Sequence, residues 1–196
     1  QLLANSSDVD GTVSLESVSY SGSDGILTTN ADGSVTFSPN ANFNGDITLN
    51  VTVVDDDGAT AETTAGITTI AVNDVPVVDG SLAYSVDEDG TITLSQQQLL
   101  SNASDVDGDN LTAENLTVAG NATVVANEDG SFTITPNADF NGDLNLSFDV
   151  SDGTASVASG VALTVNPAND AAVVEDQSFT MNEDGIIVIT DEQLLA

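Results

Sequence analysis

The chain has 196 residues, of which 32 are acidic and none is Lys, Arg or His, so its formal net charge is −32 at neutral pH. This composition excludes nucleic acid and anionic membrane surfaces as direct partners, because phosphate contacts need Lys or Arg. It also leaves solvent ions or bound cations as the means of offsetting the charge, and the absence of cysteine excludes disulfides and thiolate metal sites.

Short alternating segments separated by Gly- and Asn-rich turns run along the chain. The pattern predicts strands at 13–20, 26–29, 34–37, 46–54 and 66–72, and again at 131–134, 144–150 and 161–165. A further alternating stretch, 81–94, precedes the second set, and its counterpart, 179–189, lies near the C-terminal end. One helical turn is expected at 95–100, and few other helices because Val, Thr, Gly and Asn are so frequent. The whole pattern favours an all-β sandwich.

The sequence is a tandem repeat. The lead-in Gln-Leu-Leu begins at residues 1, 98 and 193, which gives repeats of about 95 residues. Units of this size can bury a core without cross-links. We expect the chain to be a fragment of a longer protein, because it opens inside a repeat.

The phrase that follows each lead-in carries closely spaced carboxylates. Residues 105–109 read DVDGD, and residues 8–11 read DVDG. Alternate carboxylates beside a turn-forming glycine suit a hard cation such as Ca²⁺, which takes oxygen ligands. An EF-hand is excluded, because the sixth and twelfth positions counted from Asp105 hold Asn110 and Leu116 rather than Gly and Glu. A solvated acidic turn is the alternative interpretation.

Four pieces in a fixed order resemble cadherin repeats, in particular the cadherin-like tandem repeats of large bacterial surface adhesins. They are Glu88 within 87–90, the phrase at 103–110, the Ser-Asp-Gly at 151–153, and the Asn-Asp linker phrases at 73–74 and 169–170. The resemblance implies tandem Ig-like, Greek-key β-sandwiches. It divides the chain into a repeat lacking its N-terminal strand (1–74), a complete repeat (75–170) and a segment that begins a further repeat or acts as a donor strand (171–196).

The resemblance further implies Ca²⁺ between consecutive modules. At the junction of the two copies it implies the ligands Asn73, Asp74, Asp105, Asp107 and Asp152. At the next junction it implies Glu88, Asn169 and Asp170. The full set of expected metal ligands also includes Asp8, Asp10, Asp57, Asp109, Asp139 and Glu183.

The function that the resemblance implies is a non-catalytic, Ca²⁺-stiffened stalk of an extracellular, secreted or cell-surface protein, for adhesion or biofilm matrix. Its partners would be neighbouring repeats of the same protein. A filament subunit joined to other copies by strand donation is the first alternative. Glycan binding through outward threonines such as Thr48 and Thr52 is the second. Catalysis by a carboxylate pair is not expected, because no His, Lys, Arg or Cys is present to tune it and no Trp to stack a sugar.

Overall fold

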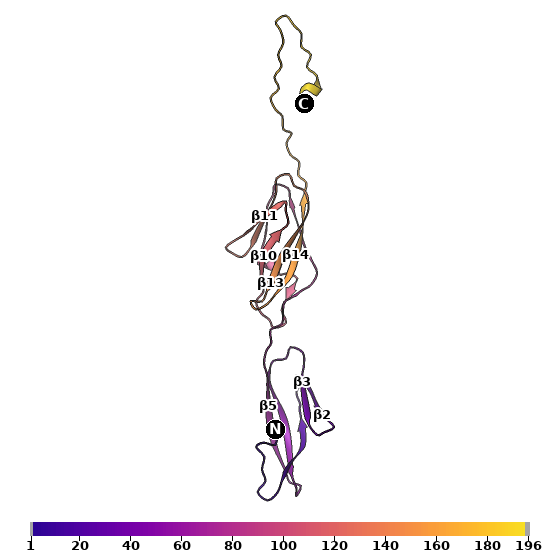
Figure 1. The fold of residues 1–196 in the computed structure, drawn as a ribbon, viewed down its shortest axis with the longest axis vertical. Helices are drawn as coiled ribbons and strands as arrows, with labels where there is room; N and C mark the ends of the chain where they lie inside the picture. Colours follow the sequence, from indigo (N-terminus) through magenta and orange to yellow (C-terminus); the bar gives the residue numbers. More distant parts are fainter. Residues whose placement is uncertain (1, 195–196) are drawn as a thin grey trace. The chain divides into compact units, whose positions relative to one another are not determined.

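The computed structural model describes residues 2–194, and its regular secondary structure consists almost entirely of β-strands (Figure 1). The first repeat, residues 1–74, holds five strands: β1 (Val13–Ser19), β2 (Gly25–Thr29), β3 (Val35–Pro39), β4 (Gly45–Asp55) and β5 (Thr60–Thr69). The second repeat, residues 75–170, holds β6 (Val77–Val78), β7 (Leu82–Asp87), β8 (Ile92–Leu94), α1 (Gln96–Leu99), β9 (Ala103–Ser104), β10 (Thr112–Val118), β11 (Ala122–Ala126), β12 (Phe132–Pro136), β13 (Gly142–Ser151) and β14 (Ser156–Asn166). The tail, residues 171–196, holds the short helix α2 (Asp191–Leu194).

The chain forms two compact units that do not coincide with the repeats. One unit comprises 1–80, 96–115 and 148–159, and the other comprises 81–95, 116–147 and 160–196. Strands β10, β13 and β14 contribute residues to both units.

In the first unit, β4 is the central strand of the three-stranded sheet β1-β4-β5. Both of its neighbours run antiparallel to it, with Val18 opposite Val51 on one side and Ala65 opposite Leu49 on the other. Strands β2 and β3 form a separate antiparallel hairpin. The alternation in β4 explains its central place, because Ile47, Leu49 and Val51 are all buried on one face.

In the second unit, β7 pairs in parallel with β14, and β8 pairs antiparallel with β12. These two short strands complete a four-stranded sheet, β10-β13-β14-β7, and a three-stranded sheet, β11-β12-β8. The second repeat therefore has two larger sheets that each end on a strand from the stretch 82–94, and β6 pairs with β9 in a separate two-stranded sheet.

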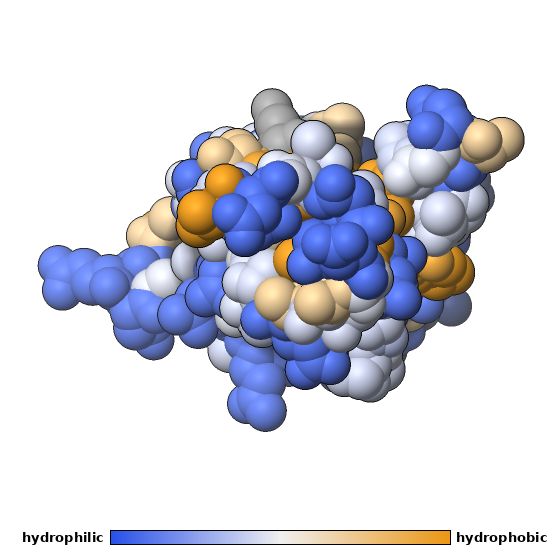
Figure 2. Space-filling model, turned by 90° about the horizontal axis from the view of Figure 1, so that it is seen from below, coloured by the Kyte–Doolittle hydropathy of each residue, from blue (hydrophilic) through white to orange (hydrophobic). Residues whose placement is uncertain are grey.

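Burial differs sharply between the repeats. Of the 17 buried apolar residues in the described chain, only three, all on β4, lie in the first repeat. The remaining fourteen lie in the second repeat and include the fully enclosed Leu94, Leu99 and Ile134. Figure 2 shows a surface dominated by hydrophilic residues, with small separate hydrophobic areas. Neither helix of the described chain has the length or apolarity that crossing a bilayer requires.

Several elements differ from the sequence-based expectation. The strand expected at 66–72 runs instead from Thr60 to Thr69, because all ten of its residues pair with β4, including the mostly polar residues 60–65. The stretch 179–189 contains no strand, because it does not pair with any other strand of the described chain. Helix α2 and the two-residue strands β6 and β9 were not expected. The helical turn expected at 95–100 is confirmed as α1.

Candidate metal centres

Three carboxylates of the second repeat's acidic phrase meet just after β9. Asp105, Asp107 and Asp109 each offer an oxygen, and these oxygens lie within 4.8 Å of one another. The backbone turns tightly here because Gly108 adopts a φ of +81°, a region that other residues rarely enter. We call these three residues the linker cluster. The sequence predicted all three as ligands.

Asp105 provides a structural test of whether the linker cluster suits a cation. Its Oδ1 accepts a hydrogen bond from the Asp107 N–H at 2.8 Å, whereas its Oδ2 is shielded from solvent and has no hydrogen-bond partner. A shielded carboxylate oxygen without a partner is costly, because it has lost its hydration. With no cationic side chain anywhere in the sequence, a bound metal ion is a group that can satisfy it. The residues present therefore fit a hard cation.

The Asn-Asp pair after the first repeat bonds directly to carboxylates from this region. The Asp74 N–H donates to Asp107 Oδ2 at 2.7 Å, and the Asn73 side-chain amide donates to Asp152 Oδ2 at 3.0 Å. The pKa of Asp152 lies below its usual value, chiefly because the Ala155 N–H donates to it and secondarily because Asn73 does. The two hydrogen bonds and the linker cluster thus bring together the five ligands predicted for this junction: Asn73, Asp74, Asp105, Asp107 and Asp152.

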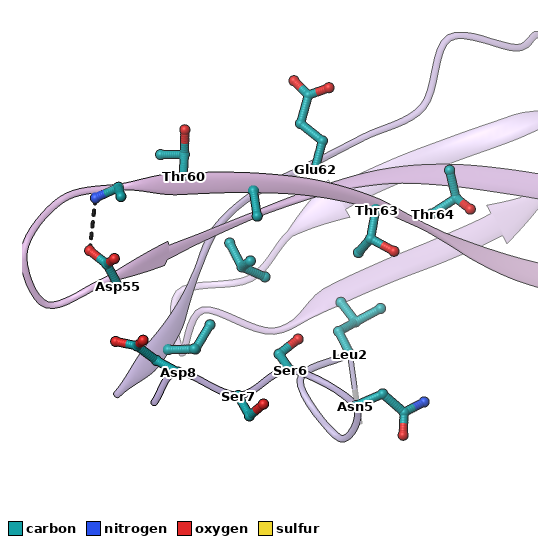
Figure 3. A pocket seen from close by; sticks show the side chains of 14 residues that line it. Leu2, Asn5, Ser6, Ser7, Asp8, Asp55, Thr60, Glu62, Thr63 and Thr64 are labelled. Atoms are coloured by element: carbon teal, nitrogen blue, oxygen red, sulfur yellow. Dashed lines mark hydrogen bonds between the residues drawn. The ribbon is translucent and has the colours of Figure 1, made fainter. Parts of the chain in front are cut away.

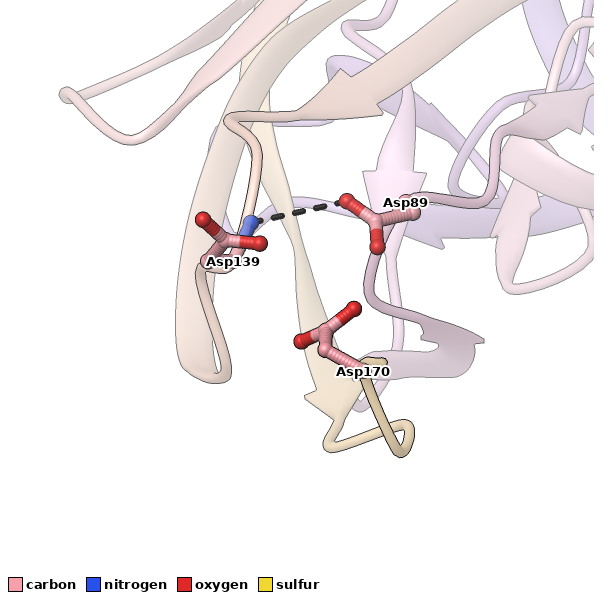
Figure 4. A group of neighbouring side chains, drawn as sticks. All are labelled: Asp89, Asp139 and Asp170. Atoms are coloured by element: carbon pink, nitrogen blue, oxygen red, sulfur yellow. Dashed lines mark hydrogen bonds between the residues drawn. The ribbon is translucent and has the colours of Figure 1, made fainter. Parts of the chain in front are cut away.

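A second group lies at turns of the second repeat and its following linker (Figure 4). Asp89, Asp139 and Asp170 bring carboxylate oxygens within 4.8 Å of one another, and all three side chains are exposed. Asp89 and Asp139 both adopt the left-handed conformation, with φ of +62° and +57°. Partial loss of hydration beside neighbouring atoms, followed by the like charges of Asp139 and Asp89, raises the pKa of Asp170 although its side chain remains exposed. We call these three residues the turn cluster.

Glu88 occupies a different environment from the one expected of an exposed ligand. It is buried, and its two carboxylate oxygens accept hydrogen bonds from the Ala168 N–H at 2.7 Å and the Asn141 side-chain amide at 3.0 Å. Its own N–H donates to the Asn166 carbonyl at 2.8 Å. Glu88 therefore fastens the turn after β7 to the end of β14, next to the turn cluster.

The carboxylates predicted in the first repeat are not brought together. Asp8, Asp10 and Asp57 are all exposed, and none of them belongs to a group of three potential ligands within the described residues. Asp8 lies at a polar pocket of about 470 Å³ between the N-terminal loop and the β4–β5 hairpin (Figure 3). Asp55, also at this pocket, accepts a hydrogen bond from the Ala59 N–H at 2.7 Å.

Two of the predicted ligands, Asn169 and Glu183, and one residue that was not predicted, Asp89, remain to be placed. The Asn169 side chain donates to the Asp170 carbonyl at 3.0 Å, as Asn73 does to the Asp74 carbonyl at 2.9 Å. Glu183 lies exposed in the tail. Asp89 was not predicted, although its place in an acidic turn before a glycine was a usable signal.

Comparisons with known proteins agree with this architecture. The sequence model of the family described as "Cadherin-like domain" matches residues 1–70 and 72–166. A search of curated protein sequences finds no match.

The solved structures that a structural search matches to the chain share little sequence with it. Human mucin-like protocadherin EC1-2 is 15% identical, covers 81% of this chain and 86% of its own, and gives a TM-score of 0.49. Protocadherin gamma B2 domains 1–5 is 15% identical, with 91% of this chain and 41% of that chain covered and a TM-score of 0.48. The endo-fucoidan hydrolase MfFcnA4_H294Q, from glycoside hydrolase family 107, is 19% identical with a TM-score of 0.38; the match covers 78% of this chain and 24% of the hydrolase, so this chain spans about a quarter of that protein.

The family match extends over both repeats and includes β1 to β14, the linker cluster, Asp89 and Asp139. The chain belongs to the cadherin-like domain family.

Proposed function

We propose that this chain is a non-catalytic, adhesion-type segment of an extracellular surface protein, in which Ca²⁺ at the acidic clusters stiffens the links between repeats. Cadherin-like domains are typically extracellular and generally bind Ca²⁺. The observation that carries the proposal is Asp105 Oδ2, a shielded and unpartnered oxygen inside a group of three carboxylates that borders the Asn-Asp linker.

The residues themselves suggest how the linker would respond to an ion. Among the described residues, the linker bonds to carboxylates of the second repeat through two hydrogen bonds, one from Asp74 and one from Asn73. Asp105, Asp107 and Asp109 repel one another, and no basic side chain offsets that repulsion. Ca²⁺ held by these three carboxylates would supply positive charge and oxygen coordination. The linker would then lose freedom to swing, and the region would gain stability by an amount that grows with RT ln(1 + [L]/Kd).

The composition supports a mechanical role over a catalytic one. The whole sequence offers no His, Lys, Arg or Cys, so a general acid or base could come only from carboxylates and two tyrosines. The carboxylate groups that do converge lie at turns and linkers, where they suit a cation shared between segments. We therefore assign the chain a role as spacer or stalk, with no reaction of its own.

The test is a calcium titration of the intact chain by calorimetry, together with small-angle scattering and thermal melting in millimolar Ca²⁺ and in excess chelator at equal ionic strength. We expect heat of binding, a stiffer particle and a higher melting temperature with Ca²⁺. Equal ionic strength matters because simple screening would otherwise imitate part of the stabilisation. Binding that is unaffected by Asp105→Asn, or no difference between calcium and chelator in shape and melting, would contradict the proposal.

A further inference from the structure

The dipeptide Asn-Gly occurs twice in the chain, each time within the sequence Phe-Asn-Gly-Asp, at residues 43–46 and 140–143. An asparagine followed by glycine loses its side-chain amide more readily than other asparagines, because glycine has no side chain to shield the backbone nitrogen that attacks. Asn141 and Gly142 are both exposed, so water reaches them, and Gly142 has a φ of +133°. Asn141 therefore has the sequence and the solvent access that deamidation requires.

The side-chain nitrogen of Asn141 is held by a buried carboxylate. This nitrogen, Nδ2, is the atom that leaves in deamidation, and it donates to Glu88 Oε2 at 3.0 Å. Glu88 is 6% exposed, and its other oxygen accepts a hydrogen bond from the Ala168 N–H at 2.7 Å. An ionised carboxylate only accepts hydrogen bonds, so it fixes which end of the amide faces it. We call Glu88 and its two donors the glutamate latch.

The glutamate latch lies where three strands of the second repeat begin or end. The Glu88 N–H donates to the Asn166 carbonyl at 2.8 Å, and the Asn166 side-chain amide donates to Asp87 Oδ1 at 3.2 Å. Asp87 and Asn166 form the last residue pair of the parallel strands β7 and β14. Asn141 directly precedes β13. A chemical change at Asn141 therefore acts on the end of the β7–β14 pairing.

We infer that Asn141 is a site of spontaneous deamidation, that the glutamate latch restrains the reaction in the folded chain, and that the product disables the latch. In the reaction, the Gly142 nitrogen gives its proton to solvent and bonds to Asn141 Cγ. The Cγ–Nδ2 bond breaks, and Nδ2 takes a proton from solvent and leaves as ammonia. Water then opens the five-membered ring. Attack of water at Cγ leaves aspartate, and attack at the backbone carbonyl carbon leaves isoaspartate.

The latch restrains the reaction because ring closure needs a particular orientation of the side chain. Cγ of Asn141 must turn onto the Gly142 nitrogen, and attack is fast only when the two reacting atoms are aligned. A side chain whose Nδ2 is bonded to Glu88 must break that bond before it can turn. Deamidation therefore proceeds through molecules in which the latch is open.

Both products replace a hydrogen-bond donor by a carboxylate. The new carboxylate repels the buried Glu88, and the sequence has no Lys, Arg or His to offset the two charges. Glu88 thereby loses its bond from residue 141, and isoaspartate in addition lengthens the backbone just before β13. The loss of ammonia is irreversible, so the latch stays open in every chain that has reacted.

Peptide mass spectrometry of the intact chain, incubated in mildly alkaline buffer with chelator, measures deamidation at each Asn-Gly pair. Digestion uses pepsin in acid, because the sequence has no Lys or Arg for trypsin to cleave. Glu88→Ala removes the acceptor and should speed deamidation of Asn141 several-fold. Asn44, in the same four-residue sequence, is the internal reference and should react at the same rate in both proteins. An unchanged or slower reaction of Asn141 in Glu88→Ala would overturn the inference.

A matched variant separates opening of the latch from general loss of stability. Leu163→Ala empties a buried site on β14 of the same repeat and removes no atom of the latch. Well below its melting temperature, this variant should deamidate at Asn141 at close to the wild-type rate. Equal acceleration in Leu163→Ala and Glu88→Ala would assign the reaction to general unfolding and would also refute the restraint by the latch.

Thermal melting of Asn141→Asp tests the effect of the product directly. This variant should melt at a lower temperature than wild type, because residue 141 then repels Glu88 instead of donating to it. The control, Asn145→Asp, adds the same charge at an exposed position of β13 and should melt close to wild type. Equal melting temperatures for the two variants would show that the product leaves the latch intact. Because all these measurements are made in chelator, their failure would leave the calcium proposal untouched.

Discussion

The two repeats have the same hydrogen bonds at an equivalent turn but differ in how many apolar residues they bury. In the first repeat, Asp32 accepts hydrogen bonds from the Ser34 N–H and hydroxyl at 3.0 and 2.7 Å. In the second, Asp129 accepts the same two bonds from Ser131 at 3.0 and 2.6 Å. Yet Ser131 is buried and Ser34 is exposed. Local sequence therefore determines the turn, whereas the segment 82–94 determines whether that turn is covered.

The largest expected effect comes from removing equivalent core side chains in the two repeats. Leu163→Ala should destabilise the second repeat by about 2–5 kcal/mol, the range for emptying a buried leucine site. Ile67→Ala should cost the first repeat less than half as much, because Ile67 is already half-exposed. Denaturant unfolding followed by a probe in each repeat would measure both. Equal costs for the two substitutions in dilute solution would show that the first repeat is as well covered as the second, contrary to the burial described above.

Calcium affinity should distinguish equivalent aspartates. Asp105→Asn removes the carboxylate whose second oxygen lacks a partner, and we expect Ca²⁺ binding to weaken by about ten- to a hundred-fold, since ligand charge sets affinity in such sites. Asp8→Asn changes the equivalent residue of the first repeat, which belongs to no cluster, and should leave calorimetric affinity unchanged. Similar losses in both variants would mean that net charge, rather than a built site, attracts the ion.

A smaller difference is expected at the shared turn. Ser131→Ala should destabilise by about 1 kcal/mol, because it removes a partly buried hydrogen bond to Asp129. Ser34→Ala removes the same bond in solvent, where water replaces it, and should be nearly neutral. Thermal melting of the two variants gives the comparison, and a larger loss for Ser34→Ala would show that burial does not set the cost.

The smallest effect concerns pH in the absence of metal. Because the pKa of Asp170 is raised in the folded chain, the folded state keeps that proton to higher pH than the unfolded state, and stability falls as pH rises through the pKa of Asp170. In chelator at neutral pH, Asp170→Asn should therefore be slightly more stable than wild type, and the advantage should vanish on acidification. Asp176→Asn, in the exposed tail, serves as control; a matching gain there would assign the effect to net charge alone.

Much of the architecture was predictable because strands show an alternating pattern of apolar and polar residues in the sequence. The face made by Ile47, Leu49 and Val51, and the expected helical turn at α1, both follow from local pattern. The length of β5 was not predictable in this way, since residues 60–65 are held by pairing with β4 rather than by their own periodicity. Pairing is a property of the partner strand, which alternation alone does not reveal.

The metal centres show the same division. Spacing predicted the linker cluster because Asp105, Asp107 and Asp109 are neighbours in sequence. The turn cluster joins residues 89, 139 and 170, which are far apart in sequence and are brought together only by the fold, so spacing could not group them. The first-repeat phrase at Asp8 and Asp10 has the right spacing without a cluster, so spacing is insufficient by itself.

The parallel pairing of β7 with β14 has a mechanical consequence. Six consecutive residue pairs, from Leu82 with Val161 to Asp87 with Asn166, join the first long strand of the second repeat to its last. A pull on the two ends of the repeat draws these parallel strands past each other along their length. The load then falls on all the ladder hydrogen bonds at once, whereas a hairpin opened from its end would break them one by one. Resistance to stretching of the second repeat is therefore concentrated in this one pair of strands.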